Sequence, residues 1–250
     1  MAQIIKKSNE LENKYKSYRT KCICAWAVCI LTFIWAAMSM PSSVFSVEEM
    51  QSKFIIVALG FGGGGMLGGY FKQKTDSYKS GVEGERTTAE IIASLPNTYC
   101  GFQNVSVTFE GKQSELDMVV VGPTGVFIIE TKNLKGTVVG NYDNPQWTQK
   151  KVGQQGTPYS KNFYNPIKQV GTHVYRLANY LRSSGCPVHI TPMVYFSNPE
   201  TVIQLLGTPS ETPVFTALGT SARDLCNYIL QNPQRVSENE ARQIVRLLCK

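Results

Sequence analysis

Two long uncharged apolar runs near the N-terminus constrain the fold of this 250-residue chain more than any other feature. The first run covers residues 22–40, and the second covers residues 54–71. As a helix, the first run would be roughly 28 Å long at ~1.5 Å per residue, close to the thickness of a bilayer's hydrocarbon core. Because only residues 41–53 separate the two runs, we expect a two-helix transmembrane hairpin over residues 22–71.

The charges beside the two runs predict the orientation of this hairpin. Residues 1–21 contain six Lys or Arg and two Glu, three lysines lie within residues 72–79, and the intervening loop is net acidic. Lys and Arg concentrate on the cytoplasmic side of membrane proteins. We therefore expect a multi-pass protein of the plasma (inner) membrane, with both termini cytoplasmic. A cleaved signal peptide is the alternative for the first run, but its apolar stretch is long for one and a second run follows it.

The second run is rich in glycine. Residues 60–65 satisfy G-x-G-x-x-G, but that dinucleotide-binding fingerprint needs a preceding strand, and here it lies inside an uncharged run. Glycines also recur at intervals of four, at Gly60, Gly64 and Gly68 and at Gly65 and Gly69. This spacing is typical of closely packed membrane helices. We expect helix packing here, with a homo-oligomer through the second span as one form of it, and no nucleotide site.

Composition limits the class of the remaining chain. The net charge is +7, of which residues 72–250 keep +4, a mild excess that suits an anionic partner such as nucleic acid without requiring one. The seven cysteines form no C-x-x-C pair, which indicates reduced thiols and argues against structural zinc. The chain has only two histidines, so zinc catalysis by histidine ligands is poorly supported.

The predicted organisation has four parts: a basic cytoplasmic N-terminus at residues 1–21, the transmembrane hairpin at residues 22–71, a linker at residues 72–80 and a globular domain at residues 81–250.

The globular domain begins with a predicted helix over residues 81–95, ended by Pro96. Glu85 falls within the apolar stripe of this helix, between Val82 and Ala89. A glutamate in this position either reaches solvent at the edge of the stripe or serves a site.

A hairpin follows in "ELDMVVVGPTGVFIIETKN", residues 115–133. Pro123 and Gly125 stand at the second and fourth positions of "GPTG", the preference of a type I turn. A turn centred after Pro123 pairs Asp117 with Glu130, and side-chain alternation places Lys132 on the same face. Three ionisable groups should therefore converge at the open end of an apolar hairpin.

Two carboxylates held this close repel each other unless a cation or a proton intervenes. Oxygen ligands favour Mg²⁺ or Mn²⁺, which keep waters able to attack a phosphodiester. Lys132 would then orient or deprotonate that water, or neutralise charge developing on the phosphate. The structural alternative is a simple ion pair between Lys132 and Asp117 or Glu130.

A helix with strong signals at both ends is predicted from Asn165, the N-cap, through Pro166 at the first turn to Gly185. Its apolar stripe is formed by Ile167, Val170, Val174, Leu177 and Leu181. Beside the stripe runs a polar line of Gln169, His173 and Arg176. This line either reaches a site or covers the flank of the helix in contact with solvent.

The remaining segments are read as strands over residues 105–109, 188–196 and 213–218, and as helices over residues 221–230 and from residue 237 onward. The last helix opens with a capping box from Ser237 to Glu240. The fold class is α/β.

The order of these features resembles the nuclease-related domain family, known as NERD, a branch of the PD-(D/E)XK nuclease superfamily. The resemblance rests on "GVEGE" at residues 81–85, "ELDMVVVGPTGVFIIETKNLKG" at residues 115–136, "PQW" ending at Trp147, and "NPIKQVGTHVYRL" at residues 165–177. Leu116 stands where the superfamily name has proline. The family resemblance implies a restriction-endonuclease-like mixed sheet flanked by helices, here preceded by the transmembrane hairpin.

The resemblance also implies roles for five residues. Asp117 and Glu130 would be metal ligands, Glu85 would be an additional acidic ligand from the first helix, and the metal would be Mg²⁺ or Mn²⁺. Lys132 would be the catalytic lysine, and Gln169 would match the helix glutamine that some of these nucleases place near the metal or phosphate.

These features together predict a membrane-anchored, metal-dependent endonuclease that hydrolyses phosphodiester bonds of DNA. Two alternatives share the fold: a nucleic-acid-binding module that does not cleave, and a membrane interaction module whose hairpin charges are structural. The intact set of Asp117, Glu130 and Lys132 favours cleavage over binding alone, because a module without catalysis need not keep all three.

Overall fold

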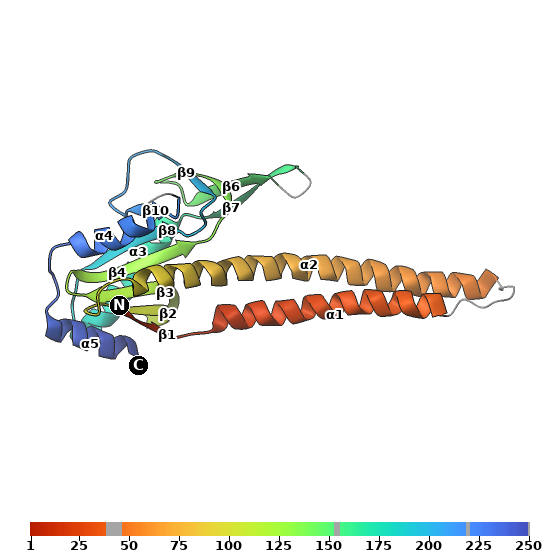
Figure 1. Cartoon of the computed structure of the whole chain (residues 1–250), viewed down its shortest axis with the longest axis horizontal. Coiled ribbons are helices and arrows are strands. Elements are labelled where there is room, and N and C mark those ends of the chain that lie inside the picture. The colour runs from red at the N-terminus through yellow and green to blue at the C-terminus, as the bar shows by residue number, and fades with distance from the viewer. Residues whose placement is uncertain (39–46, 153–155, 219–220, 250) are drawn as a thin grey trace. The chain divides into compact units, whose positions relative to one another are not determined.

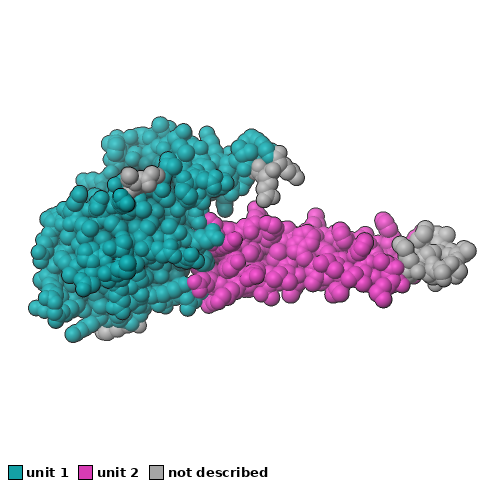
Figure 2. Space-filling view, viewed as in Figure 1, with its two compact units in different colours: residues 1–9, 81–250 teal, residues 10–80 magenta. Residues whose placement is uncertain are grey.

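A computed structural model describes residues 1–38, 47–152, 156–218 and 221–249 of the chain (Figure 1). The chain divides into two compact units (Figure 2). Unit 1 contains residues 1–9 and 81–250, and unit 2 contains residues 10–80.

Unit 2 is made of two long helices that lie side by side (Figure 1). The first is α1 (Glu10–Met38); the second is α2 (Val47–Ala93), which runs past residue 80 into unit 1. Both are long and apolar enough to cross a membrane. Residues 72–80, expected as a linker, are helical and belong to α2, with an ion pair of 2.9 Å between Lys72 and Asp76 one turn apart. Residues 39–46, which end the first predicted span and begin the predicted outer loop, lie outside the described residues.

The glycines of α2 let it pack closely on α1. A Cβ atom added to Gly64 would lie 2.6 Å from Sγ of Cys29, and one added to Gly60 would lie 2.5 Å from the Thr32 side chain. Gly68 makes the same kind of approach to Trp26. The predicted close helix packing is therefore confirmed for this face of α2. The G-x-G-x-x-G match lies inside α2 and follows directly on helical residues 47–59, so it is no dinucleotide-binding turn.

Unit 1 is built on a six-stranded mixed sheet with the order β1-β2-β3-β4-β8-β10. Its strands are β1 (Gln3–Lys6), β2 (Cys100–Phe109), β3 (Lys112–Gly122), β4 (Gly125–Lys132), β8 (Ile190–Phe196) and β10 (Val214–Thr216). β2, β3 and β4 are antiparallel neighbours, whereas β1 pairs with β2, β8 with β4, and β10 with β8 in parallel. β1 was not predicted: the first residues of the chain form the edge of the sheet.

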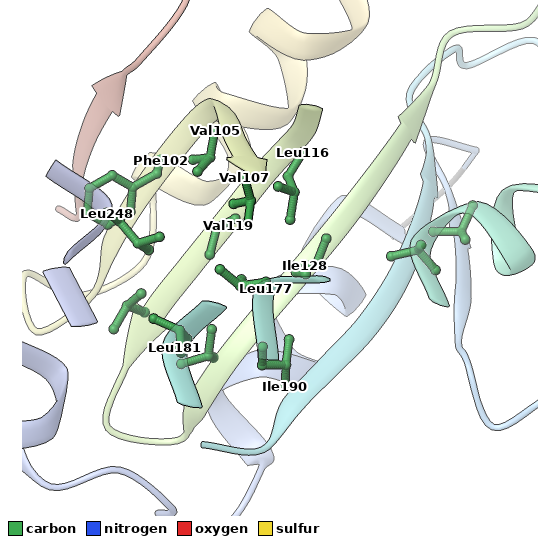
Figure 3. Packing of buried hydrophobic residues seen from close by; sticks show 14 of the residues in the cluster. Phe102, Val105, Val107, Leu116, Val119, Ile128, Leu177, Leu181, Ile190 and Leu248 are labelled. Carbon is green, nitrogen blue, oxygen red and sulfur yellow. The ribbon is translucent and has the colours of Figure 1, made fainter. Parts of the chain in front are cut away.

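Helices cover both faces of this sheet. α3 (Pro166–Ser183) and α5 (Glu238–Cys249) pack on one face, and α4 (Ser221–Gln231) and the C-terminal end of α2 pack on the other. Along β4, Val126 and Ile128 face α3, while Phe127 and Ile129 face the opposite cluster. Figure 3 shows Ile128 beside Leu177 of α3. Burial on both faces explains why the central strands are hydrophobic at every position and not at alternate ones.

A second, four-stranded sheet has the order β7-β6-β5-β9 and was not predicted from the sequence. Its strands are β5 (Gly136–Asn141), β6 (Gln146–Val152), β7 (Pro158–Tyr164) and β9 (Thr201–Leu206). Trp147 joins it to the first sheet: the buried indole stacks on Phe196 of β8 at 6.4 Å, and its Nε1 donates a hydrogen bond to the Asn141 carbonyl oxygen.

The predicted helix ends are confirmed. Asn165 Oδ1 accepts a hydrogen bond from the backbone N–H of Ile167, Pro166 opens α3, and Gly185 takes a positive φ of 76° just after it. At the start of α5, the Ser237 backbone N–H donates to the Glu240 carboxylate and Ser237 Oγ accepts from the Glu240 N–H, as a capping box requires. The mixed sheets and their helices confirm the α/β class.

Candidate active site

The candidate site lies where β3 and β4 separate. The two strands pair from Gly122 and Gly125 down to Met118 and Ile129, in the register predicted from the turn. Beyond that pair β3 continues along β2, while Glu130 and Lys132 of β4 pair only with β8. We call this point the β3–β4 fork. Asp117 and Glu130 are the first residues past the paired part of the hairpin.

The sheet is irregular at Asp117. Neither Asp117 nor Asn104 opposite it takes part in the β2–β3 ladder, although the register is unchanged on both sides, and Asn104 has a positive φ of 56°. Side-chain alternation shifts here: Val119 and Leu116, three residues apart, face the same core cluster. Asp117 Oδ2 accepts a hydrogen bond of 2.9 Å from the Thr131 N–H. The backbone N–H of Thr131 lies past the last β3–β4 pair and has no β3 carbonyl partner, so it donates to the Asp117 carboxylate instead.

Lys132 connects β4 to α3. Its Nζ donates to Glu130 Oε1 at 2.7 Å and to Gln169 Oε1 at 3.0 Å. Glu130 is almost fully buried, with 1% of its side chain exposed, and Lys132 is 21% exposed. The ion pair between Lys132 and Glu130, which was the structural alternative for these charges, is present, and the ammonium group is held between the Glu130 and Gln169 oxygens.

The second oxygen of Glu130 has a different environment. Nδ1 of His173 lies 3.5 Å from Glu130 Oε2, yet within the described part of the chain neither of these two buried atoms has a hydrogen-bond partner. His173 is therefore a buried residue facing the site, and its interpretation as a solvated flank is wrong. Arg176, further along the same line, donates to the Gln113 carbonyl oxygen and to Ser114, so it braces β3.

Glu85 is held beside the irregular part of β2. Its Oε2 accepts a hydrogen bond of 3.0 Å from Asn104 Nδ2, and its backbone carbonyl accepts one from Gln103 Nε2. The preceding Gly84 is buried, and a Cβ atom there would lie 2.8 Å from the Asn133 Cβ. A glycine at this position thus lets α2 approach the end of β4. The side chain of Glu85 is half-buried and bonded, so it does not simply point into solvent.

The surroundings of the carboxyl groups at and beside the fork disfavour their ionised form, so the pKa values of all three are raised. Burial, followed by the charge of Glu130, raises the pKa of Asp117 to about 8, although Lys132 and the Thr131 N–H oppose the shift. Burial also raises the pKa of Glu130. Burial, with smaller contributions from Asp117 and Glu115, raises the pKa of Glu85 to about 7. Ionising all three groups therefore needs added positive charge.

The two basic groups of the site shift in opposite directions. Burial alone would lower the pKa of Lys132, but the negative charges of Glu130 and Asp117 outweigh it and raise that pKa. Burial, together with the positive charges of Lys132 and Arg176, lowers the pKa of His173 to about 4. At neutral pH the site holds a protonated lysine and a neutral histidine.

The five predicted site residues come from four elements of unit 1: Glu85 from α2, Asp117 from β3, Glu130 and Lys132 from β4, and Gln169 from α3. Within the described residues, no three His, Cys, Asp or Glu side chains are gathered closely enough to form a metal-binding group. The metal-ligand roles of Glu85, Asp117 and Glu130 stay predictions.

Sequence reasoning missed Asn104 and the contact of His173 with Glu130. Asn104 lay just before a predicted strand, and only the tendency of asparagine to adopt positive φ could have marked it. His173 lies four residues after Gln169, the spacing that places two helical side chains on one face, so that pattern could have indicated its direction.

One segment of the chain matches a known protein family. Residues 80–197 match the family model of the nuclease-related domain, NERD, and this segment of the chain is a nuclease-related domain. It includes all five predicted site residues.

Among curated proteins, an uncharacterized protein of Bacillus anthracis is 34% identical to this chain over 95 residues. The match covers 36% of this chain and 44% of that protein, so the chain spans less than half of its relative's length. No solved structure matches the chain.

Proposed function

We propose that this protein is a membrane-anchored, divalent-metal-dependent nuclease that hydrolyses phosphodiester bonds of DNA. The observation that carries the proposal is the β3–β4 fork, where two carboxylates and a lysine of a nuclease-related domain meet. The mixed sheet with helices on both faces supports a restriction-endonuclease-like fold for this domain.

The chemistry of the residues at the fork supports a divalent-cation site. Glu130 Oε2 is buried and has no hydrogen-bond partner among the described residues, so it is available as a ligand. The raised pKa values of Asp117 and Glu130 mark a place where added positive charge would be stabilising. Asp117 and Glu130 would hold Mg²⁺ or Mn²⁺, with Glu85 as a further acidic residue from α2. When bound, such a metal lowers the pKa of water and polarises the phosphate.

Lys132 would act on the phosphate. A positively charged ammonium group at this position would stabilise the charge that develops on the phosphate. Gln169 accepts a hydrogen bond from Nζ and would fix its direction. His173, neutral and buried against Glu130, would limit the access of water behind the carboxylate.

The apolar surface of unit 2 supports membrane anchoring. α1 and α2 expose many large hydrophobic side chains, including Leu31 at 64% and Leu59 at 71% of their areas. Contiguous apolar surface of this extent is unfavourable in water and is covered by lipid acyl chains in a membrane. The basic residues outside both runs favour a cytoplasmic position for both ends of the hairpin.

A cleavage assay tests the proposal directly. The full chain, purified in detergent, should nick or linearise plasmid DNA with Mg²⁺ or Mn²⁺ and lose this activity in EDTA. The full chain is needed because β1, at residues 3–6, is part of the sheet. Binding of DNA without cleavage under all metal conditions would instead establish a binding module.

Calorimetry tests the metal site apart from the reaction. Mn²⁺ should bind the full chain, and Asp117→Asn or Glu130→Gln should weaken that binding at least tenfold. Glu211→Gln, at an exposed glutamate outside the site, is the matched control. Unchanged Mn²⁺ affinity in both fork variants would place the metal elsewhere.

A further inference from the structure

The two-stranded ribbon formed by β6 and β7 has no role in the site described above. Seven residue pairs join the strands, from Gln146–Tyr164 to Val152–Pro158. Figure 1 shows the ribbon extending outward from the rest of unit 1, and the same region forms a protrusion in Figure 2. Six of the seven residues of this edge strand β7 are exposed, and the seventh, Phe163, packs against Trp147. We call it the β6–β7 ribbon.

The charge on the ribbon has one sign. Residues 146–164 contain Lys150, Lys151 and Lys161 but no Asp or Glu. By cross-strand alternation, Lys151 and Lys161 lie on one face of the ribbon and Lys150 lies on the other. The ribbon is thus more basic for its length than residues 72–250 as a whole, whose net charge is +4. Concentrated positive charge on an exposed ribbon favours an anionic partner.

The other exposed side chains suit the phosphate backbone and bases of DNA. Nζ of Lys151 lies 5.0 Å from the centre of the Tyr159 ring, and Tyr164 is 50% exposed. A hollow of about 460 Å³ lies beside Lys151 and Tyr159, and among the described residues its lining includes Lys150, Thr137 and Ser160 and no carboxylate. Hydroxyl and ammonium donors of this kind bind phosphate oxygens, and tyrosine rings stack on bases.

The shape of the ribbon favours DNA over a lipid surface. A two-stranded β-ribbon fits the major groove of DNA, which is about 12 Å wide. Among the described residues of β6 and β7, five exposed positions are Gln, Ser, Asn or Lys, two are Tyr, and Val152 and Pro158 are the apolar ones. A lipid-inserting ribbon would need more apolar surface than this.

The ribbon is also connected to the candidate active site. At its base, Trp147 stacks on Phe196, which is the β8 partner of Lys132. The other strand of the ribbon, β7, ends at Tyr164, and α3 begins at Pro166. Gln169 lies in the first turn of that helix. DNA bound to the ribbon would therefore continue toward the end of the sheet that bears the fork.

We propose that the β6–β7 ribbon is a DNA-binding arm that grips the phosphate backbone beside the site of cleavage. The proposal rests on the proposed nuclease function for its choice of ligand. Its test is DNA binding, which does not require that cleavage occur.

The experiment compares two triple variants of the full chain in nonionic detergent. The arm variant carries Lys150→Gln, Lys151→Gln and Lys161→Gln. The control carries Lys112→Gln, Arg182→Gln and Arg223→Gln, which remove the same charge from exposed positions elsewhere in unit 1. The affinity for a fluorescent 30-base-pair duplex is measured with EDTA over a series of salt concentrations.

The arm variant should bind the duplex at least tenfold more weakly, and the slope of log K against log salt should fall by roughly 2.7 if all three lysines contact phosphates. The control should keep its affinity within about threefold. Equal losses in both variants, or no loss in the arm variant while the natural chain binds, would overturn the arm and leave the nuclease proposal standing. A natural chain that binds no duplex in EDTA would overturn the arm, and the plasmid cleavage assay with Mg²⁺ or Mn²⁺ decides the nuclease proposal separately.

Lysine acetylation followed by mass spectrometry gives a second readout without any variant. Duplex DNA should protect Lys150, Lys151 and Lys161 in the natural chain. Protection by anionic-lipid nanodiscs with none by DNA would overturn the proposal in favour of a membrane contact.

Discussion

At the scale of single residues, Asp117 links the shape of the sheet to the chemistry of the site. It lies where β3 leaves β4. Its carboxylate accepts a hydrogen bond from the Thr131 N–H, in the place that a carbonyl oxygen of a paired strand would otherwise take. Asp117 and Glu130 are the first residues beyond the paired part of the hairpin. The charge of Lys132 acts on both carboxylates.

Lys132→Ala should abolish most DNA cleavage while keeping Mn²⁺ and DNA binding within a few-fold. The expected loss in rate is about 10² or more, the usual scale for a positioned charge stabiliser. Lys132→Met keeps most of the side-chain stem and should give the same result with less lost packing. Plasmid cleavage with purified variants is the measurement, and activity that persists in both would point to a contaminant or another site.

The stability of the metal-free protein should fall as the pH rises from 7 to 8.5. The folded pKa of Asp117, about 8, lies above its ordinary value, so in this window the folded state binds more protons than the unfolded state. Unfolding free energy therefore decreases with rising pH. His173 does not contribute to the slope between pH 7 and 8.5, because its lowered pKa changes the stability only at pH values below the ordinary pKa of histidine.

Asp117→Asn should remove most of this pH dependence and raise the melting temperature at pH 8.5. The measurement is thermal unfolding of the full chain in detergent and EDTA, with Glu211→Gln as the control that keeps the natural slope. A variant with an unchanged slope would show that Asp117 is already ionised at neutral pH.

At the scale of elements, Gly84 determines how closely α2 approaches the end of β4. A Cβ atom there would lie 2.8 Å from the Asn133 Cβ and 3.0 Å from Ser197 Oγ, and a Cβ carbon cannot swing aside as a flexible side-chain end can. Gly84→Ala should therefore destabilise unit 1 by about 1–3 kcal/mol, the usual cost of overpacking.

The matched control is Gly171→Ala on α3, where nothing lies within 4 Å of an added Cβ among the described residues. There the better helix propensity of alanine should stabilise by up to about 1 kcal/mol. Chemical denaturation of both variants measures the difference. An equal gain in stability at both positions would mean that α2 and β4 are not in close contact.

The elements also show how far the sequence could be read. The hairpin register and both helix caps were predictable, because turn and cap residues act on their neighbours in the chain. The contacts of Asp117 and His173 were not, since they depend on the fork and on a residue of positive φ in another strand. The second sheet was missed because β6 and β7 are mostly polar and show no clear strand pattern, although Val138 of β5 and Trp147 of β6 are buried in the core cluster.

At the scale of the whole molecule, the position of β1 constrains the membrane topology. β1 pairs with β2, so residues 3–6 and the globular part of the chain belong to one folded unit. Both ends of the helical hairpin must therefore lie on the same side of any membrane, and the number of crossings must be even. Cleavage after the first apolar run would remove β1 from the sheet, which argues against a signal peptide.

Cysteine labelling in intact cells tests this topology. Ser46→Cys, in the loop predicted to lie outside, should react with a membrane-impermeant thiol reagent, and Ser80→Cys should react only after permeabilisation. The natural chain is the control, because its seven cysteines are expected in the membrane or the cytoplasm and should not react in intact cells.

Two-span insertion makes Ser46 the accessible position because the six basic residues of the N-terminal segment and the lysines after the second run resist translocation. Labelling at Ser80 alone would reverse the orientation, whereas labelling at both positions or neither would show that the pair of helices does not span the membrane. An inverted result would also place the nuclease-related domain away from cytoplasmic DNA and remove the proposed substrate.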